Sequence, residues 1–297
     1  MLKRSSIALA LSSAFAATSL FAAPQIEVIA QIVWQPNADN FGGLSALEVD
    51  NAGEGFITVS DTGVLYRGTL KRDVDGLLNG ASLSNIEPLR FEGGQRPALK
   101  QDRDTEGLAT SSAKDLYIAA EFNPRLLRYR KGQRTPQIGK LPLRGDQVPS
   151  NMGFEALALS PRNTLVAIPE GSENIRASFP VFERNATNGL WSVIYDLPRH
   201  GGFRPVGADF DENGHLYILS RGFNGFGFST RIDRLLFEDG VPSAYQPLFQ
   251  SRFRQFDNLE GLAVWHAAPD DLRLYAISDD NFRSAQQTEI IEFRLKE

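Results

Sequence analysis

The stretch that decides the fold is RDTEGLATSSAKDLYIAAEFNPR, residues 103–125. It holds two short apolar runs, GLAT and LYIAA, joined by the polar turn signal SSAKD, and this pattern predicts a β-hairpin. Glu106 opens the first run and Glu121 closes the second. Because the start of one strand lies beside the end of the next in an antiparallel hairpin, we expect both carboxylates at the same end.

The same pattern returns about every 50 residues, a period typical of propeller repeats. FEALALSPRNTLVAIPEG carries Glu155 and Glu170 at the corresponding positions, and NLEGLAVWHAAPDDLRLYAISDD carries Glu260 and Asp279. Two weaker copies are GGLSALEVDNAGEGFITVSDTG and PVGADFDENGHLYILSRG, and the latter ends on Arg221 where the other repeats carry an acid. Further β-like runs follow in each unit, so each repeat is interpreted as a blade of about four short strands.

We therefore predict an all-β protein with a single β-propeller domain over residues 23–297. Five repeats are legible, and a sixth blade is expected in the long stretch 65–101, so six blades are favoured. The run QIEVIAQIVW near the N-terminus is expected to pair with the last blade and close the ring. The composition, 42% hydrophobic and 23% charged, is that of an ordinary globular protein with ample apolar material for a core.

The first 22 residues have the pattern of an export signal. Lys3 and Arg4 precede the apolar stretch SIALALSSAFAATSLFA, and FAAP offers a small-residue cleavage site. A membrane anchor is the alternative, but the strongly apolar part is short and rich in Ala and Ser. We predict a periplasmic or secreted monomer with no stable membrane insertion after the signal is cleaved.

Composition also excludes several classes of function. The formal net charge is −5, whereas nucleic-acid binding normally needs a basic face. The chain has no cysteine, which excludes thiol catalysis and cysteine-based zinc sites. A G-x-S-x-G element is absent, so a serine hydrolase is disfavoured. Of the three histidines, His215 and His266 are expected on the far side from the carboxylates, and only His200 near them.

If the blades share one axis, the carboxylates of all the hairpins converge on one mouth of the channel. Two carboxylates about 6 Å apart repel by roughly 3 kcal/mol at an effective dielectric constant of 20, so a bound cation, arginines or added protons must compensate. Calcium suits such an all-oxygen site. Acids that only cap turns or form salt bridges between blades are the alternative. The expected metal ligands are Glu106, Glu121, Glu155, Glu170, Glu260 and Asp279.

Basic residues stand close to these acids in the sequence. EFNPR and DDNFR place an asparagine and an arginine at identical spacing after an acid, and two arginines flank the Gly- and Phe-rich stretch RGFNGFGFSTR, residues 221–231. A flexible loop is the alternative interpretation of the latter. As a wall of the channel mouth, it would offer arginines to a small anionic substrate. The expected substrate-binding residues are Arg125, Arg221, Arg231, Asn281 and Arg283.

The motifs DTEGLA, FEALALSP, NLEGLAVW and SDDNF resemble the phytase-like family described as having esterase-like activity of phytase. The resemblance covers about residues 28–295. It implies an exported six-bladed propeller with metal-dependent phosphomonoesterase or esterase activity, and it places Glu106, Glu155 and Glu260 at the inner acidic positions. The chain lacks a run of clustered Asp like the calcium-binding motif of propeller phytases, which separates it from them.

The hypothesis that combines these observations is a calcium-dependent hydrolase of phosphate esters or related esters. Glu106, Glu155 and Glu260 would be its catalytic residues, because they would hold the metal that orients a water, and the arginines would neutralise the substrate. Two alternatives stay open: a non-catalytic periplasmic propeller that binds a ligand or partner, and a metal-dependent lactonase-type propeller.

Overall fold

The computed structural model describes residues 24–122, 124–142, 153–171 and 178–297. The predicted signal segment, residues 1–22, lies outside the described residues. Within the described ranges the chain forms 20 β-strands and two short 3-10 helices. No helix in this part of the chain is long and apolar enough to cross a membrane.

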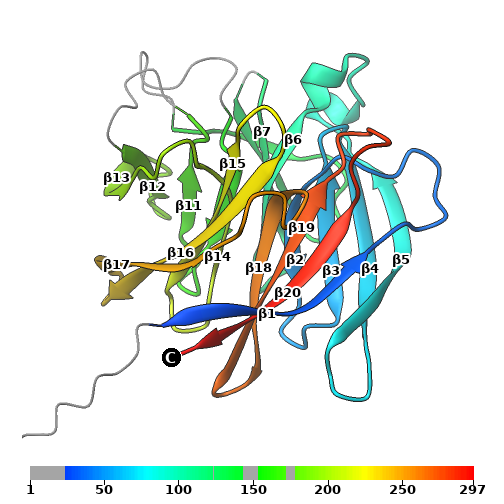
Figure 1. The fold of residues 1–297 in the computed structure, drawn as a ribbon. Helices are drawn as coiled ribbons and strands as arrows, with labels where there is room; N and C mark the ends of the chain where they lie inside the picture. The colour runs from blue at the N-terminus through cyan, green and yellow to red at the C-terminus, as the bar shows by residue number, and fades with distance from the viewer. Residues whose placement is uncertain (1–23, 123, 143–152, 172–177) are drawn as a thin grey trace, which may run out of the picture.

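The strands form five antiparallel sheets of four strands each, which we number as blades 1 to 5 (Figure 1). Blade 1 consists of β2 (Leu44–Val49), β3 (Gly55–Ser60), β4 (Val64–Arg72) and β5 (Leu78–Pro88). Blade 2 consists of β6 (Thr105–Thr110), β7 (Leu116–Ala120), β8 (Arg125–Tyr129) and β9 (Gln137–Lys140). Blade 3 consists of β10 (Ala156–Leu159), β11 (Leu165–Ile168), β12 (Ser178–Arg184) and β13 (Trp191–Pro198). Blade 4 consists of β14 (Arg204–Phe210), β15 (Leu216–Phe223), β16 (Phe228–Glu238) and β17 (Val241–Gln250).

Blade 5 joins the two ends of the folded chain. It consists of β18 (Asn258–Ala268), β19 (Asp271–Asp279), β20 (Glu289–Lys296) and β1 (Gln25–Val33). Strand β1 pairs antiparallel with β20, and the two lie side by side in Figure 1 as the blue and red ends of the chain. The prediction that the N-terminal run closes the ring is therefore confirmed.

The ring has five blades, so the prediction of six is wrong. The stretch 65–101 holds β4 and β5, which are the outer strands of blade 1, and the 3-10 helices η1 (Glu92–Gly94) and η2 (Lys100–Arg103). Strands β4 and β5 are nine and eleven residues long. These two long strands and the connection after them fill the stretch in which a sixth blade was expected.

The first strand of each blade lines the central channel, and these inner strands contact one another around the ring in the order β2, β6, β10, β14, β18 and back to β2. Three glycines permit this close approach. A Cβ atom on Gly107, Gly207 or Gly261 would lie 2.5–2.8 Å from backbone atoms of the neighbouring inner strand. No side chain fits at that distance, so the glycine of each EGL motif is explained by inter-blade packing. The apolar core lies in layers between adjacent blades.

Candidate functional site

A β-bulge recurs at the start of the inner strand in four of the five blades. The pairing with the second strand slips between Leu44 and Ala46, between Thr105 and Leu108, between Pro205 and Gly207, and between Leu259 and Gly261. A bulge leaves one extra residue unpaired and re-aims its side chain. The residues at these bulges are Ser45, Glu106 with Gly107, Val206 and Glu260.

The carboxylates at the hairpin ends meet at one mouth of the channel, which we call the acidic mouth. The charge of Glu155 acts on Glu106, that of Glu170 acts on Glu121 and Glu155, and that of Glu260 acts on Asp279. All six acids expected as metal ligands therefore lie at this mouth, but among the described residues only Glu106 and Glu121 of the six belong to a group close enough to share one ion. The six acids come from blades 2, 3 and 5.

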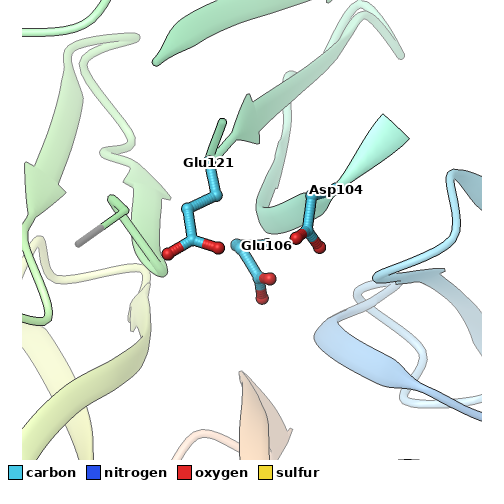
Figure 2. A group of neighbouring side chains, drawn as sticks. All are labelled: Asp104, Glu106 and Glu121. Carbon is cyan, nitrogen blue, oxygen red and sulfur yellow. The ribbon is translucent and has the colours of Figure 1, made fainter. Parts of the chain in front are cut away.

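The tightest group at this mouth consists of Asp104, Glu106 and Glu121. One carboxylate oxygen of each lies within 4.8 Å of the others, and Figure 2 shows the three side chains pointing toward a common centre. Sequence reasoning missed Asp104 as a site residue, although it stands immediately before β6 in the motif DTEG. Asp61, which immediately follows β3, also faces this cluster: burial raises the pKa of Asp104, and the charge of Asp61 adds to the rise. Asp61 too was missed as a ligand.

Burial raises the pKa of these carboxyl groups, and their mutual repulsion adds to the effect. The pKa values of Glu106 and Glu155 lie well above the ordinary value, first because of burial and then because of neighbouring carboxylates. Burial raises the pKa of Glu121 and of Glu260 to about 7, and that of Asp279 to about 8. The cluster therefore retains protons near neutral pH unless a cation binds.

Arg221 takes the place of an acid in blade 4. Its Nη2 lies 3.1 Å from Oε1 of Glu170, and its Nη1 forms an ion pair with Glu260 and donates to Oδ1 of Asn258 at 3.1 Å. Burial alone would lower the pKa of Arg221, but the charges of the surrounding glutamates have the larger effect. The pKa of Arg221 is therefore raised overall. The guanidinium thus links blade 3 to blade 5 and neutralises part of the cluster.

Two further bases at this mouth were missed by sequence reasoning. Nζ of Lys100, in η2, lies 2.7 Å from Oδ2 of Asp61. Nη1 of Arg204, at the start of β14, lies 3.3 Å from Oε1 of Glu170. Neither stands at a position that the repeat pattern marks, so only the structure reveals them.

The sequence profile of the family described as phytase-like, esterase-like activity of phytase, matches residues 39–282, more than four fifths of the chain. The chain belongs to this family. The resemblance noted from DTEGLA, FEALALSP, NLEGLAVW and SDDNF is thereby confirmed. A search of curated protein sequences found no match.

Three solved structures resemble this phytase-like chain. A luciferin-regenerating enzyme is 13% identical, with a TM-score of 0.52 over 92% of this chain and 95% of that one. A protein of unknown function from Dyadobacter fermentans is 8% identical, with a TM-score of 0.48 over 92% and 100% of the two chains. A gluconolactonase from Xanthomonas campestris is 13% identical, with a TM-score of 0.42 over 84% and 72%. The similarity to the luciferin-regenerating enzyme shows that the two chains share a fold, and nothing about a shared activity.

Three other residues expected to bind substrate lie around the acidic mouth of this phytase-like propeller. The guanidinium of Arg125 donates to the backbone oxygens of Phe122 and Asp102, each at 2.8 Å. The backbone N–H of Asn281 donates to Oδ1 of Asp279 at 2.6 Å, so Asn281 positions that carboxylate. The side chain of Arg283 is exposed.

The structure does not bring Arg231 to the acidic cluster. Its guanidinium is buried in blade 4, where Nη2 lies 2.8 Å from Oδ1 of Asp233 and 3.2 Å from the hydroxyl of Tyr245. Arg231 lies on β16, the third strand of its blade, and third strands do not line the channel. His200 is similarly engaged, with its Nε2 2.8 Å from the hydroxyl of Tyr245.

The opposite end of the channel, where the first strand of each blade turns into the second, we call the turn-side mouth. It opens into a cavity of about 670 Å³ whose lining includes Glu48, Thr110, Asp209 and His266. Oγ1 of Thr110 donates to Oε2 of Glu48 at 2.6 Å, and the backbone N–H of Val264 donates to Oδ2 of Asp209 at 2.6 Å. Glu48 and Asp209 therefore have protein partners, whereas Asp61 and Glu155 each leave a buried oxygen unpaired, so we place the candidate site at the acidic mouth.

Proposed function

We propose that this phytase-like propeller is a divalent-cation-dependent hydrolase of phosphate esters or related small anionic esters, with its site at the acidic mouth. The observation that carries the proposal is the group of Asp104, Glu106 and Glu121, whose carboxylate oxygens lie within 4.8 Å of one another. The surrounding acids add negative charge that Arg221 offsets only in part.

The donor set fits a hard divalent cation such as calcium. Calcium takes oxygen ligands at about 2.3–2.6 Å, so two ligands of one ion can lie up to about 5 Å apart. Two further oxygens of the cluster, Oδ1 of Asp61 and Oε2 of Glu155, are buried without a hydrogen-bond partner. Buried polar atoms are normally paired, so these two support the presence of a bound ligand at this mouth. Asp104, Glu106 and Glu121 would hold the ion.

A bound divalent cation would polarise the ester oxygen and make a water molecule more acidic. The protein groups then divide the proton transfers. Burial and the charge of Glu170 raise the pKa of Glu155, which favours its protonated form, so it is suited to protonate the leaving oxygen. Glu260 has a pKa of about 7 and forms an ion pair with Arg221, so it is suited to accept a proton from water.

In the proposed reaction the water oxygen forms a bond to phosphorus, and the bond between phosphorus and the bridging ester oxygen breaks. The leaving oxygen takes a proton from Glu155, and water gives a proton to Glu260. The products are an alcohol and inorganic phosphate. The half-exposed bases Lys100 and Arg204 stand at the same mouth and would favour an anionic substrate.

The test uses metal-stripped protein with each divalent cation added back singly. The substrates are p-nitrophenyl phosphate, p-nitrophenyl acetate and glucono-δ-lactone. We expect one cation to restore phosphate-ester hydrolysis, and Glu106→Gln to reduce the restored rate at least about 100-fold, the usual scale of removing one group that stabilises the transition state. Glu183→Gln, on β12, makes the same chemical change away from the channel and is the matched control.

The other outcomes identify the alternatives. Lactone turnover without turnover of p-nitrophenyl phosphate would replace the proposal with a lactonase-type activity. Saturable cation binding with no turnover of any of the three substrates would favour a ligand-binding propeller.

A further inference from the structure

The exposed phenylalanines of the described chain all belong to one end of the propeller. They lie in or beside the loops from β7 to β8, from β15 to β16, from β17 to β18 and from β19 to β20. These loops follow second and fourth strands, so they stand at the acidic mouth, at the top of the view in Figure 1. The five residues and their exposed fractions are Phe122 (43%), Phe223 (61%), Phe226 (85%), Phe253 (48%) and Phe282 (43%). We call them the phenylalanine collar.

Two members of the collar adjoin the carboxylate cluster directly. A Cβ atom on Gly43 would lie 2.4 Å from Oδ1 of Asp61 and 2.5 Å from Cε2 of Phe282. The ring and the carboxylate therefore lie no further apart than the sum of these distances. Phe122 immediately follows Glu121, whose carboxylate belongs to the proposed cation site.

The other three belong to blade 4: Phe223 and Phe226 lie in the β15–β16 hairpin, and Phe253 lies in the loop that follows β17. The ring centroids of Phe223 and Phe228 are 5.0 Å apart across the β15–β16 hairpin, and Cζ of Phe253 lies 3.1 Å from the Cβ position of Gly227 in the same hairpin. The backbone N–H of Phe226 donates to Oδ1 of Asn224 at 3.0 Å, which fixes the tip. Arg221 stands at the inner end of this hairpin, beside the acids.

Exposing the rings of the phenylalanine collar to water is energetically unfavourable unless a ligand covers them. Phenylalanine has one of the largest apolar areas of any side chain, and gathered exposed apolar groups mark binding surfaces. Exposed apolar residues at the turn-side mouth are aliphatic instead: Val74, Leu190 and Val241.

A membrane surface is the less suitable occupant. Pressing the acidic mouth against a bilayer would bring the carboxylate cluster out of water next to hydrocarbon, which costs a great deal for charged groups. The chain also carries a formal net charge of −5, which opposes binding to anionic lipids.

Resting on the proposed function, we infer that the collar binds the apolar, aromatic alcohol portion of the substrate while its anionic group lies over the acidic centre. The substrate class is then an ester of an aryl or arylalkyl alcohol rather than of a polyol. In phosphoryl transfer the attacking and leaving oxygens lie on opposite sides of phosphorus, which agrees with an alcohol portion that points outward. Water attacks phosphorus from the channel side, the bond from phosphorus to the bridging oxygen breaks, and the protonated alcohol leaves outward along the phenylalanine rings.

The experiment compares kcat/KM for 1-naphthyl phosphate and glycerol 2-phosphate in the cation-loaded protein and in Phe226→Ala and Phe282→Ala. We expect the naphthyl ester to be preferred by about 10- to 100-fold, the range that apolar contacts supply. Each variant should reduce this preference at least about threefold. Leu190→Ala, at the turn-side mouth, is the control and should leave the preference intact. An unchanged preference in both phenylalanine variants would overturn the inference.

A binding measurement separates failure of the collar from failure of the proposed activity. Binding of 1-naphthyl phosphate is followed by its fluorescence in the presence of calcium, without reliance on turnover. Weaker binding in Phe226→Ala or Phe282→Ala supports the collar even if neither ester is hydrolysed, in which case the proposed function alone fails. Co-sedimentation with anionic lipid vesicles that Phe226→Ala abolishes, with naphthyl binding unchanged, would replace the substrate by a membrane surface.

Discussion

The two mouths of the channel are built from the same inner strands, yet they differ in the hydrogen-bond partners of their carboxylates. At the turn-side mouth, Glu48 of blade 1 accepts a hydrogen bond from Thr110 of blade 2, and Asp209 of blade 4 accepts one from the backbone of Val264 in blade 5. These acids connect neighbouring blades. At the acidic mouth the carboxylates face one another, and oxygens of Asp61 and Glu155 are buried without a partner.

The difference teaches that burial and a raised pKa do not by themselves mark a functional acid. Burial raises the pKa of Asp209 to about 7 and that of Glu48 well above its ordinary value, much as it does for Glu121 and Glu260. What separates the mouths is that Oδ1 of Asp61 and Oε2 of Glu155 are buried without a protein partner, whereas Glu48 and Asp209 accept hydrogen bonds from neighbouring blades. Predictions that change one mouth and not the other test this comparison.

The largest effect is expected for Arg221→Ala. Arg221 forms ion pairs with Glu170 and Glu260, and all three side chains are largely buried. Removing one partner of a buried ion pair leaves uncompensated charge, and typically lowers the free energy of unfolding by about 3–5 kcal/mol. Urea denaturation at neutral pH measures the change. Arg204→Ala, which removes a more exposed partner of Glu170, should cost only about 0–1 kcal/mol. Equal losses in the two variants would show that Arg221 is not the internal counter-charge of the cluster.

A smaller effect is expected from calcium binding at the acidic mouth. A ligand that binds only the folded state at 100 times its Kd stabilises it by about 2.7 kcal/mol. Calcium should therefore raise the melting temperature, and Glu106→Gln should remove most of this rise. Glu48→Gln should retain it, because Glu48 belongs to the turn-side mouth. If Glu48→Gln and Glu106→Gln affect the calcium response alike, the distinction between the mouths fails.

The pH dependence of stability gives a third test. The folded-state pKa values of Glu121 and Glu260 are about 7 and that of Asp279 is about 8, whereas unfolded carboxyl groups titrate near pH 4. The folded state thus binds more protons than the unfolded state between these limits, and its stability falls as the pH rises through this window. The melting temperature of metal-free protein should decrease from pH 5 to pH 8.5. Saturating calcium should flatten the decrease, because it binds the ionised carboxylates. A rise in melting temperature over this range without metal would contradict the raised pKa values.

The smallest effect is expected for Glu48→Gln in the metal-free protein. Glutamine can still accept the hydrogen bond from Thr110 but removes a carboxyl group whose ionisation burial opposes. We expect an increase in the free energy of unfolding of about 0.5–1 kcal/mol at pH 8 and little change at pH 5, a scale typical of one net hydrogen bond. Chemical denaturation at the two pH values measures it. A large loss of stability at pH 8 would mean that the charge of Glu48 is itself required.

Much of the architecture follows from the sequence because a propeller repeats its local pattern. The hairpin register places Glu106 beside Glu121 and Glu155 beside Glu170, and the 50-residue period places the pairs on one axis. The blade count did not follow, because β4 and β5 of blade 1 are long and lie outside the recognisable hairpin. Counting only the hairpin motifs would have given five.

The site was harder to predict where it departs from the repeat. Asp104 and Lys100 stand before a first strand, in the connection between blades 1 and 2, where each blade differs in length and sequence. Arg231 was misplaced for a related reason. It shares a face of β16 with Asp233, two residues further on, and because β16 is the third strand of its blade, this face lies away from the channel.

The pairing of β1 with β20 has a kinetic consequence. It joins Ile26 to Leu295, so the ring closes only after almost the whole chain has been synthesised. Bringing together ends separated by some 270 residues costs about 5 kcal/mol of loop-closure entropy, and contacts this distant in sequence are associated with slow folding. Glu260 and Asp279 belong to the blade that completes the ring. A half-made chain therefore already brings together the carboxylates of blades 2 and 3, and those of blade 5 join them only at the final step of folding.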